Sequence, residues 1–289
     1  MNVSNIYKSI RSISRNENIN RVSALSKYIA WQAQKASNRF PCILPFSESE
    51  LVVHNKEIAN GVGGLVKCQG MYDYNNMGLI KELLQHHLHV LIDIGANVGT
   101  YALIASEVNG AQIYAFEPHP FTFELLSENI QHNNRSNVQL VNKAVAANNT
   151  KLQFTNMPGS SVNKIVDANH PNNKIIEVDS VSLDAFCEER GIVPEIVKID
   201  VEGFEKDVLS GFGAMLNKAK ICFVEISESR DEILSQFEKA GFFGPYYHNF
   251  RKRTFFKNKA DASFEDPVFV HNSFKSVLEK SDFKFVESC

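Results

Sequence analysis

A glycine-containing turn between an apolar strand and a helix constrains this chain more than any other feature. Val90–Ile94 is short and apolar, as a buried strand is, and Thr100–Val108 has the spacing of a helix. The residues between them are Gly95-Ala96-Asn97-Val98-Gly99. Glycines permit a tight turn and let backbone N–H groups approach a ligand, and the start of the helix favours an anionic group. The segment predicts a cofactor site at the end of a strand.

Glu117 is the second distinctive residue, because it closes the apolar segment Gln112–Phe116. It follows Gly95 by roughly 20 residues, a spacing that places an acid where it accepts hydrogen bonds from ribose hydroxyls. Dinucleotide sites need a glycine where this turn has Asn97, because a pyrophosphate lies there. The turn therefore favours a ligand with a smaller anionic group, and a nicotinamide oxidoreductase is kept as an alternative.

The chain after Val90 alternates short apolar strands with helices. The predicted elements are strands at Val138–Val141, Ile196–Ile199 and Ile221–Ile226 and helices at Phe121–Gln131, Gly203–Leu209 and Asp231–Ala240. Repeated β-α units predict an α/β fold with a doubly wound, mostly parallel sheet that is buried on both faces. The rhythm stops between Lys151 and Phe186, where we predict a β-hairpin or loop insertion that carries substrate contacts.

The first 70 residues differ from the rest and are expected to form a basic arm and a small β/helical extension, with the catalytic domain at 71–289. Up to residue 39 there are seven basic side chains and one acid. A helix over Arg21–Ala36 would pack through an apolar face. That face consists of Val22, Leu25, Ile29 and Ala33. Weak contact of the arm with an anionic lipid or glycan surface is the alternative. Further strands are predicted at Ile43–Leu44, Leu51–Val53 and Leu65–Val66, and a helix at Met77–His87.

Composition argues against several function classes. The net charge of −3 and pI near 6.3 disfavour nucleic acid as the main partner. No apolar run approaches the roughly 18 residues of a membrane-spanning helix, and no secretory signal is visible. The five scattered cysteines predict reduced thiols in a cytoplasmic protein. His86, His87 and His89 lack a zinc spacing, so no metal site is predicted.

Three segments together resemble the FkbM family of methyltransferases. They are Asp93-Ile94-Gly95-Ala96-Asn97-Val98-Gly99, Phe116-Glu117-Pro118 and Val197-Lys198-Ile199-Asp200-Val201-Glu202-Gly203. The resemblance covers roughly Met71 to Gly241; Gly159-Ser160-Ser161 and Ser182-Leu183-Asp184 are similar to weaker family features. It implies a class I, Rossmann-like methyltransferase fold, S-adenosyl-L-methionine as cofactor, and methyl transfer to a hydroxyl. The acceptor would be a glycan, a sugar-linked metabolite or a small natural product. A non-catalytic cofactor-binding scaffold is a further alternative.

The resemblance also implies a set of cofactor contacts. These residues are Tyr72, Asp93, Gly95, Asn97, Gly99, Thr100, Glu117, Pro118, Asn142 and Ala144. Two positions depart from the family pattern. Tyr72-Asp73 stands where members often have a Tyr-Glu pair, and Asn142-Lys143-Ala144 where related enzymes have an acid beside the adenine amino group. Adenine contact would then come from the Asn142 amide, from backbone or from packing.

Methyl transfer to an alcohol requires a base that accepts the hydroxyl proton. Asp200, after Ile196–Ile199, is the first candidate, and Glu202 follows it. Two close carboxylates would raise each other's pKa. The pair could instead hold a divalent cation or orient the cofactor. Alternatively, Glu202 has only a structural role, as an acid that the helix dipole stabilises in the first turn of the following helix. Glu225 ends the next strand, where it would bind substrate or cap the strand, and Lys198 would pair with an acid.

Two further groups of residues have open roles. His119 would border the adenine site or serve the structure alone. An aromatic and basic wall for a polar substrate is one interpretation of the segment near the C-terminus, and a β-hairpin surface is the other. Its residues are Tyr246, Tyr247, His248, Phe250, Arg251 and Arg253.

Overall fold

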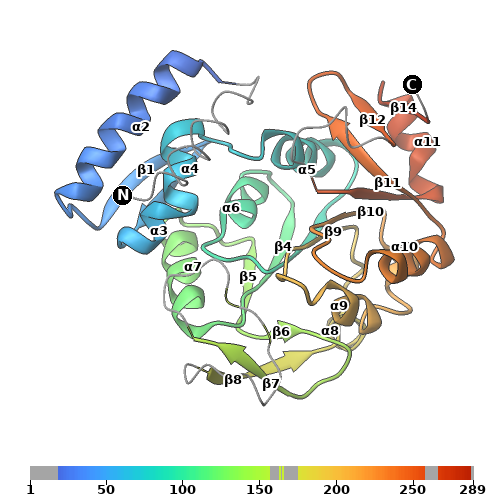
Figure 1. Ribbon diagram of the computed structural model, residues 1–289. Helices are drawn as coiled ribbons and strands as arrows, with labels where there is room; N and C mark the ends of the chain where they lie inside the picture. The colour runs from blue at the N-terminus through green and yellow to red at the C-terminus, as the bar shows by residue number, and fades with distance from the viewer. Residues whose placement is uncertain (1–18, 157–162, 164, 166–174, 258–265, 288–289) are drawn as a thin grey trace. The chain divides into compact units, whose positions relative to one another are not determined.

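The chain divides into two units between Tyr74 and Asn75. The computed structural model describes residues 19–156, 163, 165, 175–257 and 266–287 of the 289. The first unit is blue to light blue in Figure 1, and the second runs from cyan to red. Within the described ranges, every helix is too short or too polar to cross a bilayer.

From residue 19 on, the first unit combines three helices with a two-stranded sheet. Its elements in chain order are α2 (Arg21–Ala36), β1 (Cys42–Phe46), β2 (Ser49–Val53), α3 (Lys56–Asn60) and α4 (Val62–Gln69). Asn20 caps α2, because its side-chain oxygen accepts the N–H of Ser23 at 3.0 Å. The strands β1 and β2 pair antiparallel, with Cys42 opposite Val53. The predicted helix therefore has the predicted bounds.

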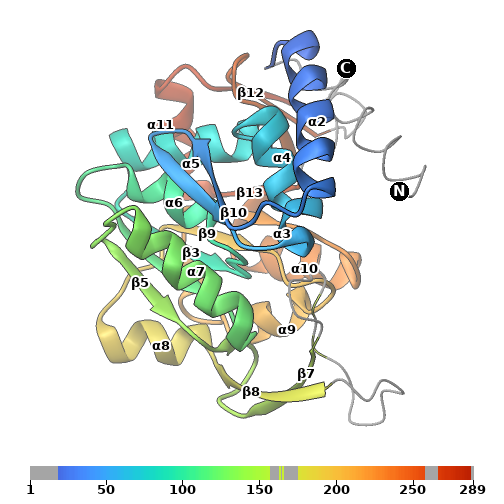
Figure 2. The same cartoon turned by 90° about the vertical axis from the view of Figure 1, so that its left-hand side faces the viewer.

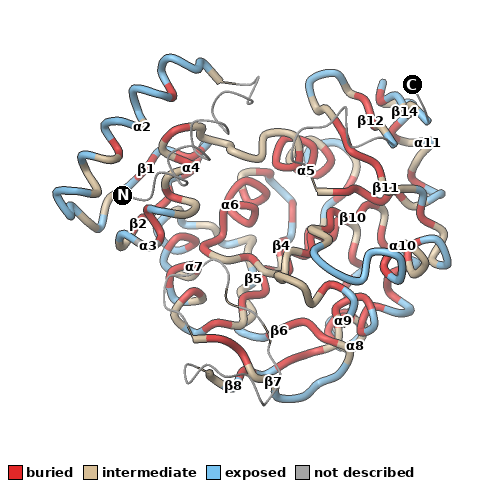
Figure 3. Tube along the Cα trace, in the orientation of Figure 1, coloured by how far each residue is buried: buried red, intermediate tan, exposed pale blue. Residues whose placement is uncertain are grey.

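The predicted apolar face of α2 is wrong. Val22 is 81% exposed and Ile29 64% exposed, whereas Ala24 and Trp31 are buried. Figure 3 shows most of α2 in the colour of exposed residues. Ala24 and Trp31 lie seven residues apart on one helix face, and Trp31 offers far more apolar area than any side chain of the predicted face. Burial of the tryptophan thus sets the orientation of the helix, and contact of the arm with a surface stays a prediction.

The predicted strand at Leu65–Val66 is also wrong, because these residues belong to the helix α4. Gly63 and Gly64 had indicated a turn. In the structure they allow close packing: a Cβ on Gly63 would lie 3.0 Å from the carbonyl oxygen of Ile58, and one on Gly64 would lie 3.4 Å from Nε1 of Trp31. Tertiary packing within the first unit therefore overrides the local turn signal.

The second unit is built on a nine-stranded sheet with the order β14-β12-β11-β13-β10-β9-β3-β4-β5. The five parallel strands are β3 (Val90–Ile94), β4 (Gln112–Phe116), β5 (Val138–Val141), β9 (Ile196–Ile199) and β10 (Ile221–Val224). Four of them have the predicted bounds, and β10 ends two residues earlier than predicted. The chain progresses from β3 to β5 in one direction and through β9 and β10 in the other. The sheet therefore reverses its order beside β3, which confirms the doubly wound, mostly parallel fold.

Helices lie on both faces of this sheet (Figures 1 and 2). They are α5 (Tyr74–His86), α6 (Thr100–Ser106), α7 (Pro120–His132), α8 (Leu183–Arg190), α9 (Glu205–Ser210), α10 (Arg230–Lys239) and α11 (Asn272–Lys280). One face of β3 and β9 packs through Ile92, Ile94, Val197 and Ile199 onto buried side chains of α8, α9 and α10. The opposite face carries Asp93 and Lys198 and meets Tyr101 of α6.

A small second sheet forms where the β-α rhythm was predicted to stop. The strand β7 (Lys151–Thr155) pairs antiparallel with β8 (Ile175–Val181), and β8 pairs parallel with β6 (Ala144–Val145). The antiparallel pair agrees with the predicted hairpin. Substrate contacts from this insertion stay a prediction, and the predicted feature Gly159-Ser160-Ser161 lies outside the described residues.

The predicted substrate wall near the C-terminus is wrong. Four further strands extend the main sheet here: β11 (Phe242–Asn249), β12 (Thr254–Phe256), β13 (Val268–His271) and β14 (Lys284–Val286). The β10–β13, β13–β11 and β11–β12 pairs are antiparallel, and β12 and β14 pair parallel. Tyr246, Tyr247 and His248 are at most 2% exposed, so they belong to the core. Arg253 stacks on the ring of Phe283 and pairs with a carboxylate of α5. The alternative of a hairpin was right, but its aromatic residues are buried by the neighbouring strands.

Candidate active site

The carboxyl ends of β3, β4, β9 and β10 meet at one edge of the main sheet. The backbone N–H of Asp200 donates to the carbonyl of Ile94 at 3.0 Å, and that of Glu225 donates to Ile199 at 2.9 Å. The N–H of Gly95 donates to Phe116, also at 3.0 Å. These bonds bring the glycine turn and the ends of three neighbouring strands together, as expected for a ligand site at the switch point of an α/β sheet.

The glycine turn needs three residues with left-handed backbone. The φ angles are +82° at Gly95, +50° at Asn97 and +91° at Gly99, and glycine and asparagine are the residues that tolerate this region. A Cβ on Gly95 would lie 1.8 Å from the backbone carbonyl oxygen of Asp200. The positive φ and the lack of room for a Cβ therefore both require glycine at position 95. The glycine lets the turn pack closely against the end of β9.

Glu117 directly contacts the glycine turn. Its Oε2 accepts the backbone N–H of Asn97 at 3.0 Å, and its Oε1 accepts that of His119 at 2.9 Å. Burial raises the pKa of Glu117 to about 7, against the lowering effect of these two bonds. A carboxylate has about four lone-pair sites, so each oxygen keeps room for one further donor. The residue can thus accept two hydroxyl groups in addition to its backbone donors.

Three charged residues lie side by side behind this edge. Asp93 stands opposite Lys198 in the register of β3 and β9, and the ammonium of Lys198 donates to Oδ2 of Asp200 at 2.8 Å. The predicted pairing of Lys198 with an acid is thereby confirmed. The ring of Tyr101 lies 4.6 Å from the same ammonium. Burial lowers the pKa of Lys198, but the charges of Asp200 and Asp93 outweigh this and raise it.

Asp93 is completely buried, and neither of its oxygens forms a hydrogen bond of good geometry within the described chain. Burial raises its pKa to about 6, although the Lys198 ammonium acts in the opposite direction. An unsatisfied buried carboxyl is costly and needs compensation by a nearby cation or donor. The ammonium of Lys198, opposite Asp93 in the neighbouring strand, is that cation.

Asp200 and Glu225 form a hydrogen-bonded pair of carboxyl groups. Burial, followed by this bond and the charge of Asp200, raises the pKa of Glu225 to about 8. The pKa of Asp200 is lowered, because Lys198 and the two hydrogen bonds outweigh the effect of burial. Glu225 therefore carries the shared proton, and Asp200 is the ionised partner. The side chain of Asp200 is 34% exposed, so the carboxylate remains accessible.

Two expectations about Glu202 and its partner need correction. The expected rise in the pKa of Asp200 is wrong, because the ammonium of Lys198 dominates its surroundings. Glu202 also does not lie in the first turn of its helix. It precedes α9, which begins at Glu205, and its φ of +52° is unusual for a side chain of this kind. A non-glycine residue in this region costs about 1–3 kcal/mol, which the surrounding structure must compensate.

Three predicted cofactor contacts belong to other elements of the structure. The Nδ2 of Asn142 donates to the backbone carbonyls of Glu117 and Pro118 at 2.8 and 3.2 Å, so it anchors this loop. Ala144 is buried in β6 beside Phe154. Tyr72 belongs to the first unit. An adenine contact from the amide donors of Asn142 is thus disfavoured, and backbone or packing contacts stay a prediction.

Several other residues named in the sequence analysis cap helices or hold loops in the structure. His119 is buried and caps α7, where its Nδ1 accepts the N–H of Thr122 at 3.4 Å. Ser182 caps α8, and the carboxylate of Asp184 accepts three backbone N–H groups at 213–215. Thr100 is buried at the start of α6, and Pro118 is half-buried after Glu117. Among the described residues, no group of three His, Cys, Asp or Glu side chains is arranged for a metal ion.

Sequence reasoning missed the role of Glu225 as the proton-bearing partner of Asp200. A usable signal was present, since both residues directly follow neighbouring apolar strands. The opposition of Asp93 and Lys198 was missed as well. Each is a charged residue within an otherwise apolar strand, and only the strand register shows that they are neighbours.

A family comparison identifies this arrangement. The model described as Methyltransferase FkbM domain matches residues 93–243, just over half of the chain. The chain therefore belongs to the FkbM methyltransferase family, and its fold is that of class I methyltransferases. Membership implies the use of S-adenosylmethionine.

Curated relatives share about half of this chain. Hexuronic acid methyltransferase AglP of Haloferax volcanii is 32% identical over 49% of this chain and 57% of its own length. 2-O-methyltransferase NoeI of Sinorhizobium fredii is 28% identical over 52% of this chain and 68% of its own length. Less than two thirds of AglP is therefore matched. Among solved structures, the METTL16 MTase domain aligns with a TM-score of 0.45 and 13% identity over 79% of this chain and 85% of that one.

The residues at this edge fit a sulfonium cofactor. Asp93 and Asp200 lie near the ammonium of Lys198, and Asp200 in turn lies near the carboxyl groups of Glu117 and Glu225. Such an excess of acid attracts a cation. The spare lone pairs of Glu117 match a ribose diol. The unsatisfied carboxyl of Asp93 fits a neighbouring positive group.

Above about pH 6.5, the free energy of unfolding of the ligand-free protein is expected to fall as the pH rises. The pKa values of Glu117 and Glu225, about 7 and about 8, exceed the ordinary 4.5, so up to about pH 8 the folded state binds more protons than the unfolded state. The lowered pKa values of His119, His248 and His271 act in the opposite direction, but only below their ordinary 6.5.

Urea denaturation at half-unit pH steps from about 6.5 to 8 measures this slope. The variant Glu225→Gln should show a shallower decline, because one of the two titrating groups is gone. A free energy of unfolding that is constant or rises over this range in the unaltered protein would contradict the assignment.

Proposed function

We propose that this protein transfers a methyl group from S-adenosylmethionine to a hydroxyl oxygen of a glycan, a sugar-linked metabolite or a small natural product. Family membership supports methyl transfer, and AglP and NoeI are named for methylation of a hexuronic acid and of a 2-O position. The observation that carries the cofactor site is the hydrogen bond from Asn97 of the glycine turn to Glu117. It joins the two elements that the sequence had predicted to hold one ligand.

In this proposal, most of the predicted contacts hold the cofactor. Glu117 accepts its ribose hydroxyls, and the backbone of Gly95, Asn97 and Gly99 borders its amino-acid part, with Asp93 behind. When bound, the cofactor supplies a methyl group on a sulfonium, which is ready for displacement by a nucleophile. Pro118 and Thr100 border the same space. Residues 71–289 form the catalytic domain.

We assign the proton transfer to Asp200. Its exposed carboxylate, at the end of β9, would accept a hydrogen bond from the acceptor hydroxyl and thereby orient the oxygen. A carboxylate with a low pKa suffices as the base, because a hydroxyl becomes strongly acidic once its oxygen has gained a methyl group. Lys198 holds Oδ2 of Asp200, and the proton on Glu225 stabilises the charged form. Glu202, which follows Asp200 by two residues and has a left-handed backbone conformation, would contact the acceptor.

The proposed function is tested with a panel of acceptors. The pure protein is incubated with S-adenosylmethionine and with hexuronic acid glycosides, neutral hexose glycosides and phenolic alcohols, and release of S-adenosylhomocysteine is measured. We expect acceptor-dependent release and a product that is heavier by one methylene group, with the methyl on oxygen. Binding of the cofactor without transfer to any acceptor would favour a non-catalytic scaffold instead. A saturable NADH fluorescence signal without S-adenosylmethionine binding would favour an oxidoreductase.

A further inference from the structure

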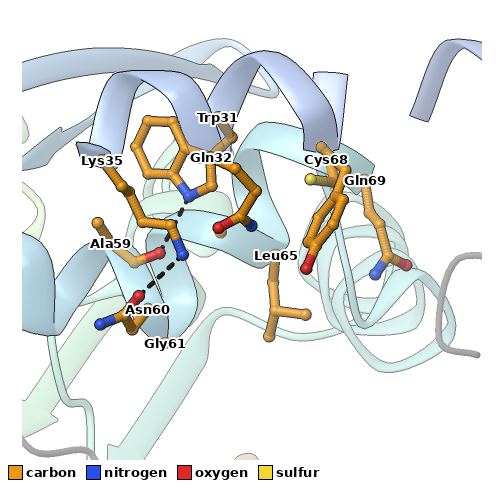
Figure 4. Close-up of a pocket in the computed structure, with 11 residues that line it drawn as sticks. Trp31, Gln32, Lys35, Ala59, Asn60, Gly61, Leu65, Cys68 and Gln69 are labelled. Carbon is orange, nitrogen blue, oxygen red and sulfur yellow. Dashed lines mark hydrogen bonds between the residues drawn. The ribbon is translucent and has the colours of Figure 1, made fainter. Parts of the chain in front are cut away.

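The first unit contains a cavity of about 190 Å³ between α2 and the segment from α3 to α4, separate from the site described above. Figure 4 shows Lys35 and Gln32 extending from α2 toward this space, with Leu65, Cys68 and Gln69 of α4 across from them. All of its lining residues lie in the first unit. We call this space the α2 cavity.

The walls of the α2 cavity are fixed by specific contacts. Trp31 is 1% exposed, and its Nε1 donates to the backbone carbonyl of Ala59 at 3.0 Å. Gly64 allows α4 to approach this ring closely. Lys35 Nζ donates to Oδ1 of Asn60 at 2.8 Å, which holds the ammonium at the edge of the cavity. A preformed space with a positioned charged group is the usual form of a small-ligand site.

Among the described residues that line the α2 cavity, Lys35 is the charged one. The ammonium of Lys35 has three donors, and the amide oxygen of Asn60 is its hydrogen-bond partner. No acidic residue is among those that line the cavity in the described part of the chain. Lys27 and Lys67 add positive charge nearby, since both lower the pKa of the Cys68 thiol, which burial raises overall. Burial also lowers the pKa of Lys35, as expected of an ammonium without a carboxylate partner.

The volume of the cavity and its other lining residues limit the class of ligand that fits. At about 30 Å³ per water molecule, the cavity holds the equivalent of about six waters, which corresponds to roughly one sugar ring. The amides of Gln32 and Asn60 offer donors and acceptors for hydroxyl groups, while Leu65 and Tyr28 offer apolar contact. This combination suits a compact molecule with several hydroxyls.

We propose that the α2 cavity binds a sugar-sized, hydroxylated organic anion whose carboxylate or phosphate group pairs with Lys35. The site is independent of the methyl-transfer site, and its test requires neither a methyl donor nor an acceptor. A carboxylate or phosphate would supply a charged partner, which Lys35 does not have among the described lining residues, and would form a charge-assisted hydrogen bond with it.

The experiment uses the full-length protein and its single tryptophan, Trp31, as the reporter. Intrinsic fluorescence and calorimetry follow titrations with glucuronate, glucose 6-phosphate, glucose and inorganic phosphate. We expect saturable binding of glucuronate or glucose 6-phosphate and at least about tenfold weaker binding of glucose, the neutral ring of the same size. Tighter binding of glucuronate would identify the preferred anionic group as a carboxylate, and tighter binding of glucose 6-phosphate would identify it as a phosphate.

Two variants test the role of Lys35. Lys35→Met removes the ammonium and keeps the apolar stem, and Asn60→Asp keeps Lys35 but neutralises it with an adjacent carboxylate. Each should weaken binding about tenfold or more. The control Arg21→Met removes an exposed cation of α2 that does not line the cavity and should leave affinity nearly unchanged. Circular dichroism verifies that each variant is folded.

Three results would overturn the proposal. The first is the absence of saturable binding by any of the anions. The second is binding that both Lys35→Met and Asn60→Asp leave unchanged, or that Arg21→Met weakens equally. The third is binding of inorganic phosphate as tight as that of the sugar anions, because the cavity would then recognise a simple oxyanion only.

Discussion

Replacement of Asp200 by asparagine is expected to lower methyl-transfer turnover by about 10²–10⁴-fold, the usual contribution of a positioned general base. Asparagine keeps the size of the side chain and an oxygen that can accept the hydrogen bond from Lys198. It cannot take up the hydroxyl proton. The substitution therefore removes the proposed chemistry and leaves the shape of the site intact.

Affinity for S-adenosylhomocysteine should change little in the same variant. The close contact between Asp200 and the glycine turn involves the backbone carbonyl, which the substitution does not alter. S-adenosylhomocysteine carries no sulfonium charge, so loss of the Asp200 charge affects it less than it affects the cofactor. Turnover and product affinity together distinguish a base from a residue that supports cofactor binding.

Glu228→Gln is a matched control for this experiment. Glu228 is an exposed acid, and its carboxyl group would lie 3.6 Å from a Cβ on Gly203, in the loop that follows Asp200. Its removal takes a similar charge from the same neighbourhood, and turnover should stay near that of the unaltered protein. Normal turnover in Asp200→Asn would contradict the assignment of the base, and an equal loss in both variants would indicate a general electrostatic effect.

Gly95→Ala is expected to lower the free energy of unfolding by about 2–5 kcal/mol and to abolish cofactor binding. Two costs combine at this position. A left-handed backbone with φ of +82° costs a side-chain-bearing residue about 1–2 kcal/mol. The added Cβ would also lie 1.8 Å from the carbonyl oxygen of Asp200, so the turn and the end of β9 would have to separate.

Gly110→Ala separates these two costs. Gly110 has nearly the same backbone, with φ of +84°, but a Cβ there would meet no atom within 4 Å. Urea denaturation of both variants should therefore show the smaller loss, about 1–2 kcal/mol, at Gly110. Equal losses at the two positions would show that the close approach of the turn to β9 does not contribute.

The sequence was sufficient for the central sheet because its strands are buried on both faces. Val90–Ile94 and Ile196–Ile199 are short apolar runs whose bounds need no knowledge of their neighbours. The orientation of α2 could not be predicted in the same way. Its buried face depends on where Trp31 finds space against α3 and α4, and that is a tertiary property.

In the candidate site as well, the features that depend on local sequence could be predicted, and those that depend on tertiary structure could not. The glycine turn and Glu117 were predictable, since each depends on local backbone geometry and on spacing along the chain. The protonation of Glu225 and the ionisation of Asp200 were not predictable, because they depend on Lys198, Asp93 and the register of neighbouring strands. Sequence proximity had favoured Glu202 as the partner of Asp200, whereas strand pairing supplies Glu225.

Calorimetric titration with S-adenosylhomocysteine tests the cofactor site most directly. Binding should be measurable for the unaltered protein and weaker by about tenfold or more in Glu117→Ala, because a hydrogen bond to a charged group contributes about 1.5–3 kcal/mol. Glu124→Ala, which removes an exposed acid of α7, should bind normally. No detectable binding by the unaltered protein, or the same affinity in Glu117→Ala, would contradict the account.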